Sequence, residues 1–195
     1  MDQNLGETQS PKPQKYYRVI IIGYHWIGII IDDQLKWNEW NNEQCKTISK
    51  GVALLRNAKD FVSQEVLVTM FNSLVLPYFN YCSTVWHGNN SSHTNNLFKL
   101  QKRAARIITS SDYSIRSTQI FETLQWQPIK TILDKRELIM MFKVLKGMAP
   151  DYLKTLFHVC NNSSYPLRTN NLKINLPKPK TNFLKKSFTY HGAAS

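Results

Sequence analysis

The chain has 195 residues, of which 42% are hydrophobic and 12% aromatic, enough to bury the core of an ordinary domain. This composition excludes collagen-like, coiled-coil and fully disordered chains. Its 25 Lys and Arg residues against 13 Asp and Glu give a formal net charge of +12. Such a positive surplus favours a polyanionic partner, with nucleic acid ahead of an anionic membrane surface.

Cysteine usage and the apolar segments bear on the compartment. Cys45, Cys82 and Cys160 are widely spaced and form no CxxC pair, which is typical of small buried thiols under reducing conditions. The first 14 residues do not have the basic start and apolar stretch of a signal peptide. The longest apolar run, 19–31, is shorter than the roughly 20 residues that span a membrane. We therefore expect an intracellular protein, nuclear or cytoplasmic, with no membrane partner.

The N-terminal third predicts a short hairpin followed by a helix. We expect residues 1–15 to be a disordered leader and 16–160 to form one domain. Residues 16–31 are rich in Ile, Val, Tyr and Trp and predict two short strands. A helix is predicted from about residue 38 to 61, because apolar residues recur there at helical spacing. They are Trp40, Ile48, Val52, Leu55 and Phe61 or Val62.

The next segment predicts a second helix and an aromatic block. Ser63 is a favourable N-cap, and Glu65 places a negative charge in the first turn. The expected apolar stripe of this helix is Val66, Met70 and Leu74. Pro77 should break or restart the helix. The aromatic side chains that follow are expected to fill the core rather than to stack on bases. They are Tyr78, Tyr81 and Trp86.

The clearest amphipathic helix covers 97–108, after a polar turn at 88–92. Four cations recur at spacings of zero, three, four and seven residues, which places them within an arc of roughly 100°. They are Lys99, Lys102, Arg103 and Arg106. The opposite side is apolar, and no acidic residue occurs between Glu65 and Asp112. Taken alone, this helix fits a solvated charged face and a nucleic-acid contact equally well.

The last part of the chain predicts shorter helices and a basic tail. After a turn at 110–114, helices are expected over 115–124 and from Pro128 to about residue 146, with Gly147 as C-cap. One or two more turns are expected within 152–159. We expect 161–195 to be extended or partly disordered, and it has no acidic residue. Its cations alternate with aromatic residues, which favours nucleic-acid contact. The contact candidates there are Lys178, Lys180, Lys185 and Lys186.

No self-contained active site is evident. Asp32 and Asp33 follow an apolar strand, as in the metal-binding turn of polymerases. However, no second strand is predicted after them, and the upstream acids lie in the leader, so turn or capping roles are favoured. The five histidines do not have zinc-ligand spacing, and the seven glycines are scattered. We therefore expect no catalytic residues, no metal site and no cofactor.

Four blocks resemble non-LTR (LINE, jockey-like) retrotransposon reverse transcriptases. Residues 26–37 read WIGIIIDDQLKW and resemble the family's LGVxxDxxLxW segment after the palm. Residues 76–86 read LPYFNYCSTVW and resemble PYxxYCxxVW. Residues 97–108 read LFKLQKRAARII and resemble LxxLQKRAxRII. Residues 187–193 read SFTYHGA and resemble SFxYxGA. The order and spacing of the four blocks agree with those of the family over about residues 24–193.

The resemblance implies a thumb-like, post-palm fragment of a reverse transcriptase. The fingers, the palm and its catalytic aspartates should precede residue 24, and a Trp-Asn-x-Leu-Pro segment should follow the last block; neither is present. The resemblance implies that such a region of the parent enzyme is expected to grip the RNA or DNA template–primer, with Lys102, Arg103 and Arg106, which match its basic helix, as contact candidates. Association with other chains encoded by the same element is a further expectation.

We therefore expect a mainly α-helical protein: five to six helices, a short N-terminal β-hairpin and an extended basic C-terminal tail. The leading hypothesis is a non-catalytic fragment of an RNA-directed DNA polymerase that contacts template–primer nucleic acid. The alternative is a helical protein-interaction remnant, or a decayed transposon copy, with no nucleic-acid role. A third hypothesis, an enzyme with Asp32 and Asp33 as metal ligands, is the least favoured.

Overall fold

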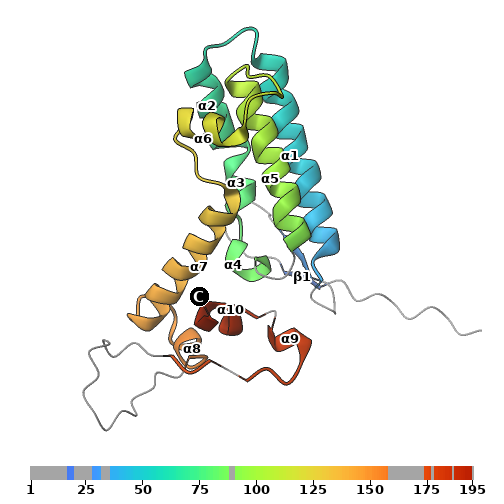
Figure 1. Ribbon diagram of the computed structural model, residues 1–195. Helices are drawn as coiled ribbons and strands as arrows, with labels where there is room; N and C mark the ends of the chain where they lie inside the picture. Colours follow the sequence, from blue (N-terminus) through green and yellow to red (C-terminus); the bar gives the residue numbers. More distant parts are fainter. Residues whose placement is uncertain are drawn as a thin grey trace, which may run out of the picture.

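The computed structural model describes residues 17–19, 28–31, 36–87, 91–157, 174–176, 178–185 and 187–194. Within these residues the protein is mainly α-helical, as the sequence predicts. Two long helices, α1 (Asn38–Ala58) and α5 (Ser91–Ile108), lie side by side (Figure 1). Helix α2 (Gln64–Leu74) packs against both of them. The expected leader, 1–15, lies outside the described residues.

Two short strands precede α1, in the segment where the sequence predicts them. Strand β1 (Tyr17–Val19) pairs antiparallel with β2 (Ile29–Ile31), with Tyr17 opposite Ile31. Ile29 is buried in the same cluster of apolar side chains as Trp37 and Trp40. The small sheet is therefore attached to the helical core near the beginning of α1.

Most of the apolar positions predicted for α1 lie in the core. Ile48 and Leu55 are fully buried and Val52 nearly so, while Trp40 is 8% exposed. The predicted end of the helix is wrong, because α1 stops at Ala58 and Phe61 is 86% exposed in the turn that follows. Val62 instead packs partly against the core. Helical spacing continued to Phe61, but the chain turns there to bring α2 back along α1.

The N-cap predicted for α2 is confirmed. The predicted stripe is wrong for Val66 and Leu74, whereas Met70 packs partly buried against the core. Ser63 Oγ accepts a hydrogen bond from the backbone N–H of Val66 at 3.5 Å. The buried residues are Leu67 and Phe71, and the ring of Phe71 stacks on Trp126 with centroids 4.2 Å apart. Val66 and Leu74 are 45% and 41% exposed. The predicted stripe and the pair Leu67 and Phe71 both have helical spacing. Trp126, which is distant in sequence, packs on Phe71 and therefore favours burial of the second set.

Gly51 of α1 lies tightly against the end of α2. A Cβ atom added to Gly51 would lie 2.8 Å from Val75 Cγ2 and 3.4 Å from the backbone oxygen of Leu74. We expect Gly51→Ala to lower the free energy of unfolding by about 1–3 kcal/mol, since Val75 is fully buried and overpacking forces a shift. Urea denaturation measures this, with Asn57→Ala on the exposed side of α1 as the control. Equal stability of the two variants would contradict the close approach.

The aromatic block forms two short helices, α3 (Leu76–Asn80) and α4 (Ser83–Trp86), separated by a turn. Pro77 stands in the first turn of α3, which confirms the predicted restart. Trp86 is 2% exposed, and its Nε1 donates a hydrogen bond to the Tyr81 carbonyl at 2.8 Å. Tyr81 is half-buried. The core prediction is wrong for Tyr78, which is 40% exposed because α3 turns that ring outward.

Helix α6 (Ser117–Thr123) and helix α7 (Ile129–Leu145) occupy the two segments predicted to be helical. Pro128 is the N-cap residue of α7, one position before its expected place. Gly147 has φ 71°, a conformation that costs glycine little. Its N–H bonds to the Val144 carbonyl at 3.2 Å, and the N–H of Met148 bonds to the Lys143 carbonyl at 2.8 Å. This pair of bonds is a Schellman motif and fits the predicted C-cap.

The described part of the tail is not simply extended, which corrects the prediction. After α8 (Asp151–Lys154), the described residues form α9 (Asn182–Lys185) and α10 (Phe188–Ala194). Helix α10 lies beside the end of α7, and α9 lies beside α10 (Figure 1). The ring of Phe188 meets that of Phe157 edge to face at 5.7 Å, and Gly192 lies directly against Met141. These contacts join residues distant in sequence, so the sparse apolar pattern of the tail did not reveal them.

Candidate nucleic-acid interface

Helix α5 carries the main candidate site, and its apolar side is buried as predicted. It begins at Ser91, inside the polar turn expected at 88–92. Leu97 and Ala104 are fully buried and Ile108 is 2% exposed, packed between α1, α2 and α7. Burial of this stripe fixes the rotation of α5. The opposite side, with its cations, therefore faces away from the core.

We call the four cations of this side the α5 basic face: Lys99, Lys102, Arg103 and Arg106. Lys99 and Arg103 are exposed, whereas Lys102 and Arg106 are half-buried. Lys102 Nζ lies 4.7 Å from the centroid of the Phe98 ring. In the described part of the chain, the salt bridges are Lys46–Glu43 and His87–Asp134, so none of the four cations pairs with a described carboxylate.

Arg106 differs from the other three cations because its side chain contacts another segment of the protein. Its Nη2 donates a hydrogen bond to the Ile115 carbonyl at 3.2 Å, and its guanidinium lies 5.3 Å from the centroid of the Tyr113 ring. Both partners belong to the turn between α5 and α6. Arg106 thus holds this turn against α5, which leaves Lys99, Lys102 and Arg103 as the stronger candidates for contact.

A polar hollow of about 510 Å³ lies between the first halves of α1 and α5, next to the basic face. Lys99 belongs to its rim, so the hollow continues the face. Amide and hydroxyl groups both donate and accept hydrogen bonds, as contacts to phosphate, sugar and base edges require. The side chains that supply these groups are Asn38, Asn41, Asn42, Ser49, Ser92 and Asn96.

His93 at the same hollow is a structural residue. Its Nε2 lies 2.8 Å from Gln44 Oε1, while the Gln44 amide donates to the Tyr78 carbonyl. Because the oxygen of Gln44 accepts, His93 Nε2 carries the proton. Burial, and then the nearby His87, lower the pKa of His93 to about 4. This histidine therefore stays neutral at physiological pH and joins α5 to α1 and α3.

Sequence reasoning missed Gln101, which lies inside the LQKR block. It is 3% exposed and joins α5 to the start of α7. Its Nε2 donates to the Gln127 carbonyl at 2.9 Å, and its Oε1 accepts from the Ile129 N–H at 2.8 Å. Its spacing of four residues from Leu97 was the available signal, since it places Gln101 on the buried stripe.

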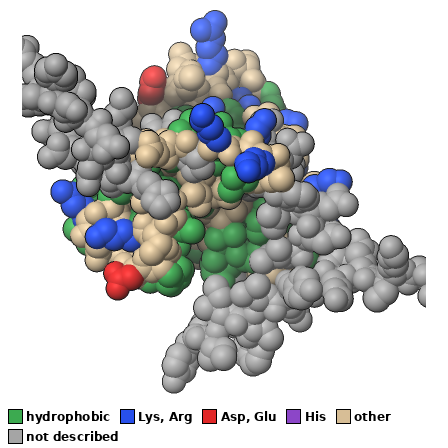
Figure 2. Space-filling view, turned by 90° about the horizontal axis from the view of Figure 1, so that it is seen from below, with side chains coloured by type: hydrophobic (Ala, Val, Ile, Leu, Met, Phe, Trp, Pro, Cys, Tyr) green, Lys and Arg blue, Asp and Glu red, His purple; other side chains and the backbone are tan. Residues whose placement is uncertain are grey.

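The basic residues of the tail do not join the α5 basic face. Lys178, Lys180 and Lys185 are exposed, and Lys186 lies outside the described residues. Helix α9 packs on α10, and α10 packs on α7, at the end of the molecule opposite α6 (Figure 1). Seen from this end, Lys and Arg side chains are spread among hydrophobic ones (Figure 2). The tail cations and the α5 basic face are therefore separate basic regions.

Glu137 is a second residue that the sequence did not reveal. It stands in the buried stripe of α7 and is 6% exposed, and its Oε1 has no hydrogen-bond partner within the described chain. Burial, and then the charge of Asp134, raise the pKa of Glu137 from 4.5 to about 7. The folded state therefore favours the protonated carboxyl.

This raised pKa predicts a pH-dependent loss of stability. Between pH 4.5 and about 7 the folded state binds more protons than the unfolded state, so stability falls as the pH rises. We expect Glu137→Gln to stabilise the protein by about 1–2 kcal/mol at about pH 8 and to have little effect at about pH 4. Urea denaturation at both pH values measures it. A similar pH-dependent gain in Glu122→Gln, on the exposed side of α6, would contradict the assignment to burial.

Other site chemistry is limited in the part of the chain that the structure covers. Among the described residues, no group of three or more His, Cys, Asp or Glu side chains could hold a metal ion. Asp32 and Asp33 lie outside the described residues. Within the same residues, no helix is long and apolar enough to cross a membrane.

Comparisons with models of protein families, with curated proteins and with solved structures found no match. The features of this chain that bear on its function are the side chains of the α5 basic face and the four sequence blocks at 26–37, 76–86, 97–108 and 187–193.

Proposed function

We propose that this chain binds template–primer nucleic acid through the α5 basic face, as a non-catalytic, thumb-like part of a retrotransposon reverse transcriptase. The observation that carries the proposal is the grouping of Lys99, Lys102 and Arg103 on one side of α5 without a described carboxylate partner. The resemblance of 97–108 to the LQKRA helix of that family is a second support.

The physical basis is neutralisation of the phosphate backbone. Each cation that contacts a phosphate releases a condensed counterion, which favours binding at low salt and carries no sequence information. The asparagine-lined hollow beside Lys99 adds neutral hydrogen-bonding groups to the same region. Polymerisation would require the palm of the parent enzyme, so the role proposed here is to hold the duplex.

Titration of the purified chain with an RNA–DNA duplex at several salt concentrations tests the proposal. We expect the logarithm of the binding constant to fall linearly with the logarithm of the salt concentration, by about 0.9 per phosphate contacted. Duplexes of different sequence should bind alike. Absence of binding at low salt, or binding that ignores salt, would overturn the proposal.

A helical protein-interaction module is the second candidate, and one observation favours it. Leu138, Ile139 and Phe142 lie on one side of α7 and are 48%, 45% and 53% exposed. Adjacent exposed apolar side chains are typical of surfaces that associate with other proteins. Self-association that is insensitive to salt, without any change on addition of duplex, would favour this candidate over nucleic-acid binding.

A further inference from the structure

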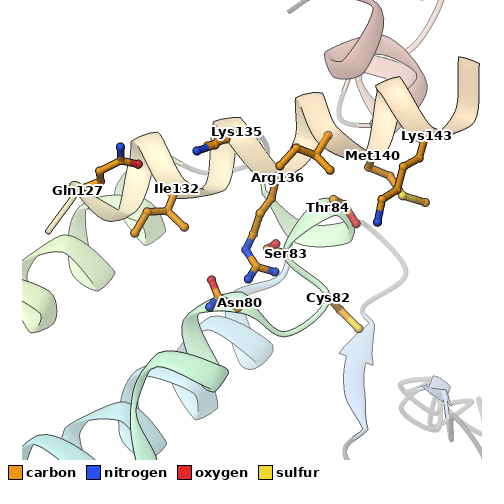
Figure 3. Close-up of a pocket in the computed structure, with 11 residues that line it drawn as sticks. Asn80, Cys82, Ser83, Thr84, Gln127, Ile132, Lys135, Arg136, Met140 and Lys143 are labelled. Atoms are coloured by element: carbon orange, nitrogen blue, oxygen red, sulfur yellow. The ribbon is translucent and has the colours of Figure 1, made fainter. Parts of the chain in front are cut away.

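A second hollow, of about 610 Å³, lies between α7 and the turn that joins α3 to α4 (Figure 3). Three of its lining residues are the cations Lys135, Arg136 and Lys143, all from α7. None of its lining residues is acidic. The hollow has no lining residue in common with the α5 basic face, so it is a separate positively charged site.

The wall opposite α7 is polar. Arg136 extends from α7 across the hollow toward Ser83 and Asn80, and Thr84 lies beside it on α4 (Figure 3). Asn80 Oδ1 is buried and has no hydrogen-bond partner within the described residues. Rotation of this amide would present its two N–H donors instead. Guanidinium, ammonium, hydroxyl and amide groups together form the donor set that recognises phosphate.

Besides its three cations, α7 lines the hollow with the apolar side chains Ile132, Ile139 and Met140. A hollow of this volume lies within the usual range of small-ligand sites, about 300–1,000 Å³, which combine apolar walls with a few polar groups. A polymer backbone would use the charges but not the apolar wall. The mixed lining therefore favours a small molecule that carries both a phosphate and an apolar group.

We propose that this hollow binds a small organic phosphate. Its phosphate group contacts Arg136, Lys143 and the hydroxyls of Ser83 and Thr84, and its apolar part lies on Ile132, Ile139 and Met140. This site is independent of the nucleic-acid function proposed for α5, because different helices supply the two sets of cations. Either proposal can therefore fail without the other.

Calorimetric titration of the full chain with phenyl phosphate and with inorganic phosphate tests the site. We expect saturable binding of phenyl phosphate that is about tenfold tighter than that of inorganic phosphate, owing to burial of the ring. Arg136→Gln should weaken phenyl phosphate binding by about tenfold or more, since it removes a charge-assisted bidentate donor. Lys130→Gln removes an exposed cation of α7 outside the hollow and should leave the affinity unchanged.

Thermal unfolding of Arg136→Gln and Lys130→Gln checks that each substitution leaves the fold intact. Equal affinity for the two phosphates, or an equal loss in the two variants, would overturn the proposal. A short RNA–DNA duplex added to the phenyl phosphate complex distinguishes the source of the phosphate. Displacement by the duplex would overturn the small-molecule assignment, whereas retention of phenyl phosphate supports it.

Discussion

Gln101→Leu is expected to lower the free energy of unfolding by about 2–5 kcal/mol, the largest stability effect predicted for this chain. The glutamine amide satisfies two backbone groups at the start of α7, the Gln127 carbonyl and the Ile129 N–H. Leucine fills a similar volume but leaves both groups without their partner. Ile129 is fully buried, so water is poorly placed to replace the bond to its N–H.

Urea denaturation compares this variant with Gln119→Leu, which changes an exposed glutamine of α6. The control should remain within about 0.5 kcal/mol of the unchanged protein. If the two variants were equally stable, the link between α5 and α7 would contribute nothing, and Gln101 would have to be treated as a surface residue of the LQKR block.

The double variant Lys99→Gln/Arg103→Gln is expected to weaken duplex binding by about tenfold at low salt and to reduce the salt slope by about 1.8. Lys99 and Arg103 are the exposed members of the α5 basic face, so their replacement should leave the fold intact. Each of the two substitutions removes a positive charge and keeps a polar side chain. The loss should be the same for duplexes of different sequence, since phosphate contacts carry no sequence information.

Lys50→Gln/Lys154→Gln is the matched control, because it removes two exposed cations from α1 and α8. It has the same net charge as the α5 variant, so overall charge affects both equally. A control that loses as much affinity and as much salt slope would show that binding depends on net charge and not on α5. Arg106 is left unchanged in both variants because its bond to Ile115 holds the turn after α5.

The α5 helix shows which features the sequence alone predicts. Its amphipathic pattern predicted the buried side correctly, and the grouping of four cations followed from the spacing. The four cations have different surroundings, and their spacing in the sequence does not predict this difference. Arg106 contacts Tyr113 and Ile115, which reach it because the chain turns back after α5. The polar hollow beside Lys99 exists because α1 lies against α5.

The α2 helix shows the opposite case. Two sets of apolar residues in α2 recur at helical spacing: Val66, Met70 and Leu74, and the pair Leu67 and Phe71. The local pattern therefore does not indicate which set is buried. Phe71 is buried because Trp126, more than fifty residues later in the chain, supplies the ring on which it stacks. In α10, Phe188 likewise packs against a residue from a distant segment, Phe157.

By itself, the sequence determined the helical class, the caps at Ser63 and Gly147, and the positive face of α5. These features depend on neighbours within a turn or two, where side-chain spacing and backbone preference act directly. The tertiary structure alone decided the buried face of α2, the link through Gln101, the burial of Glu137 and the cationic hollow beside α7. Each of these requires groups from distant segments to meet, and packing of the whole chain sets that arrangement.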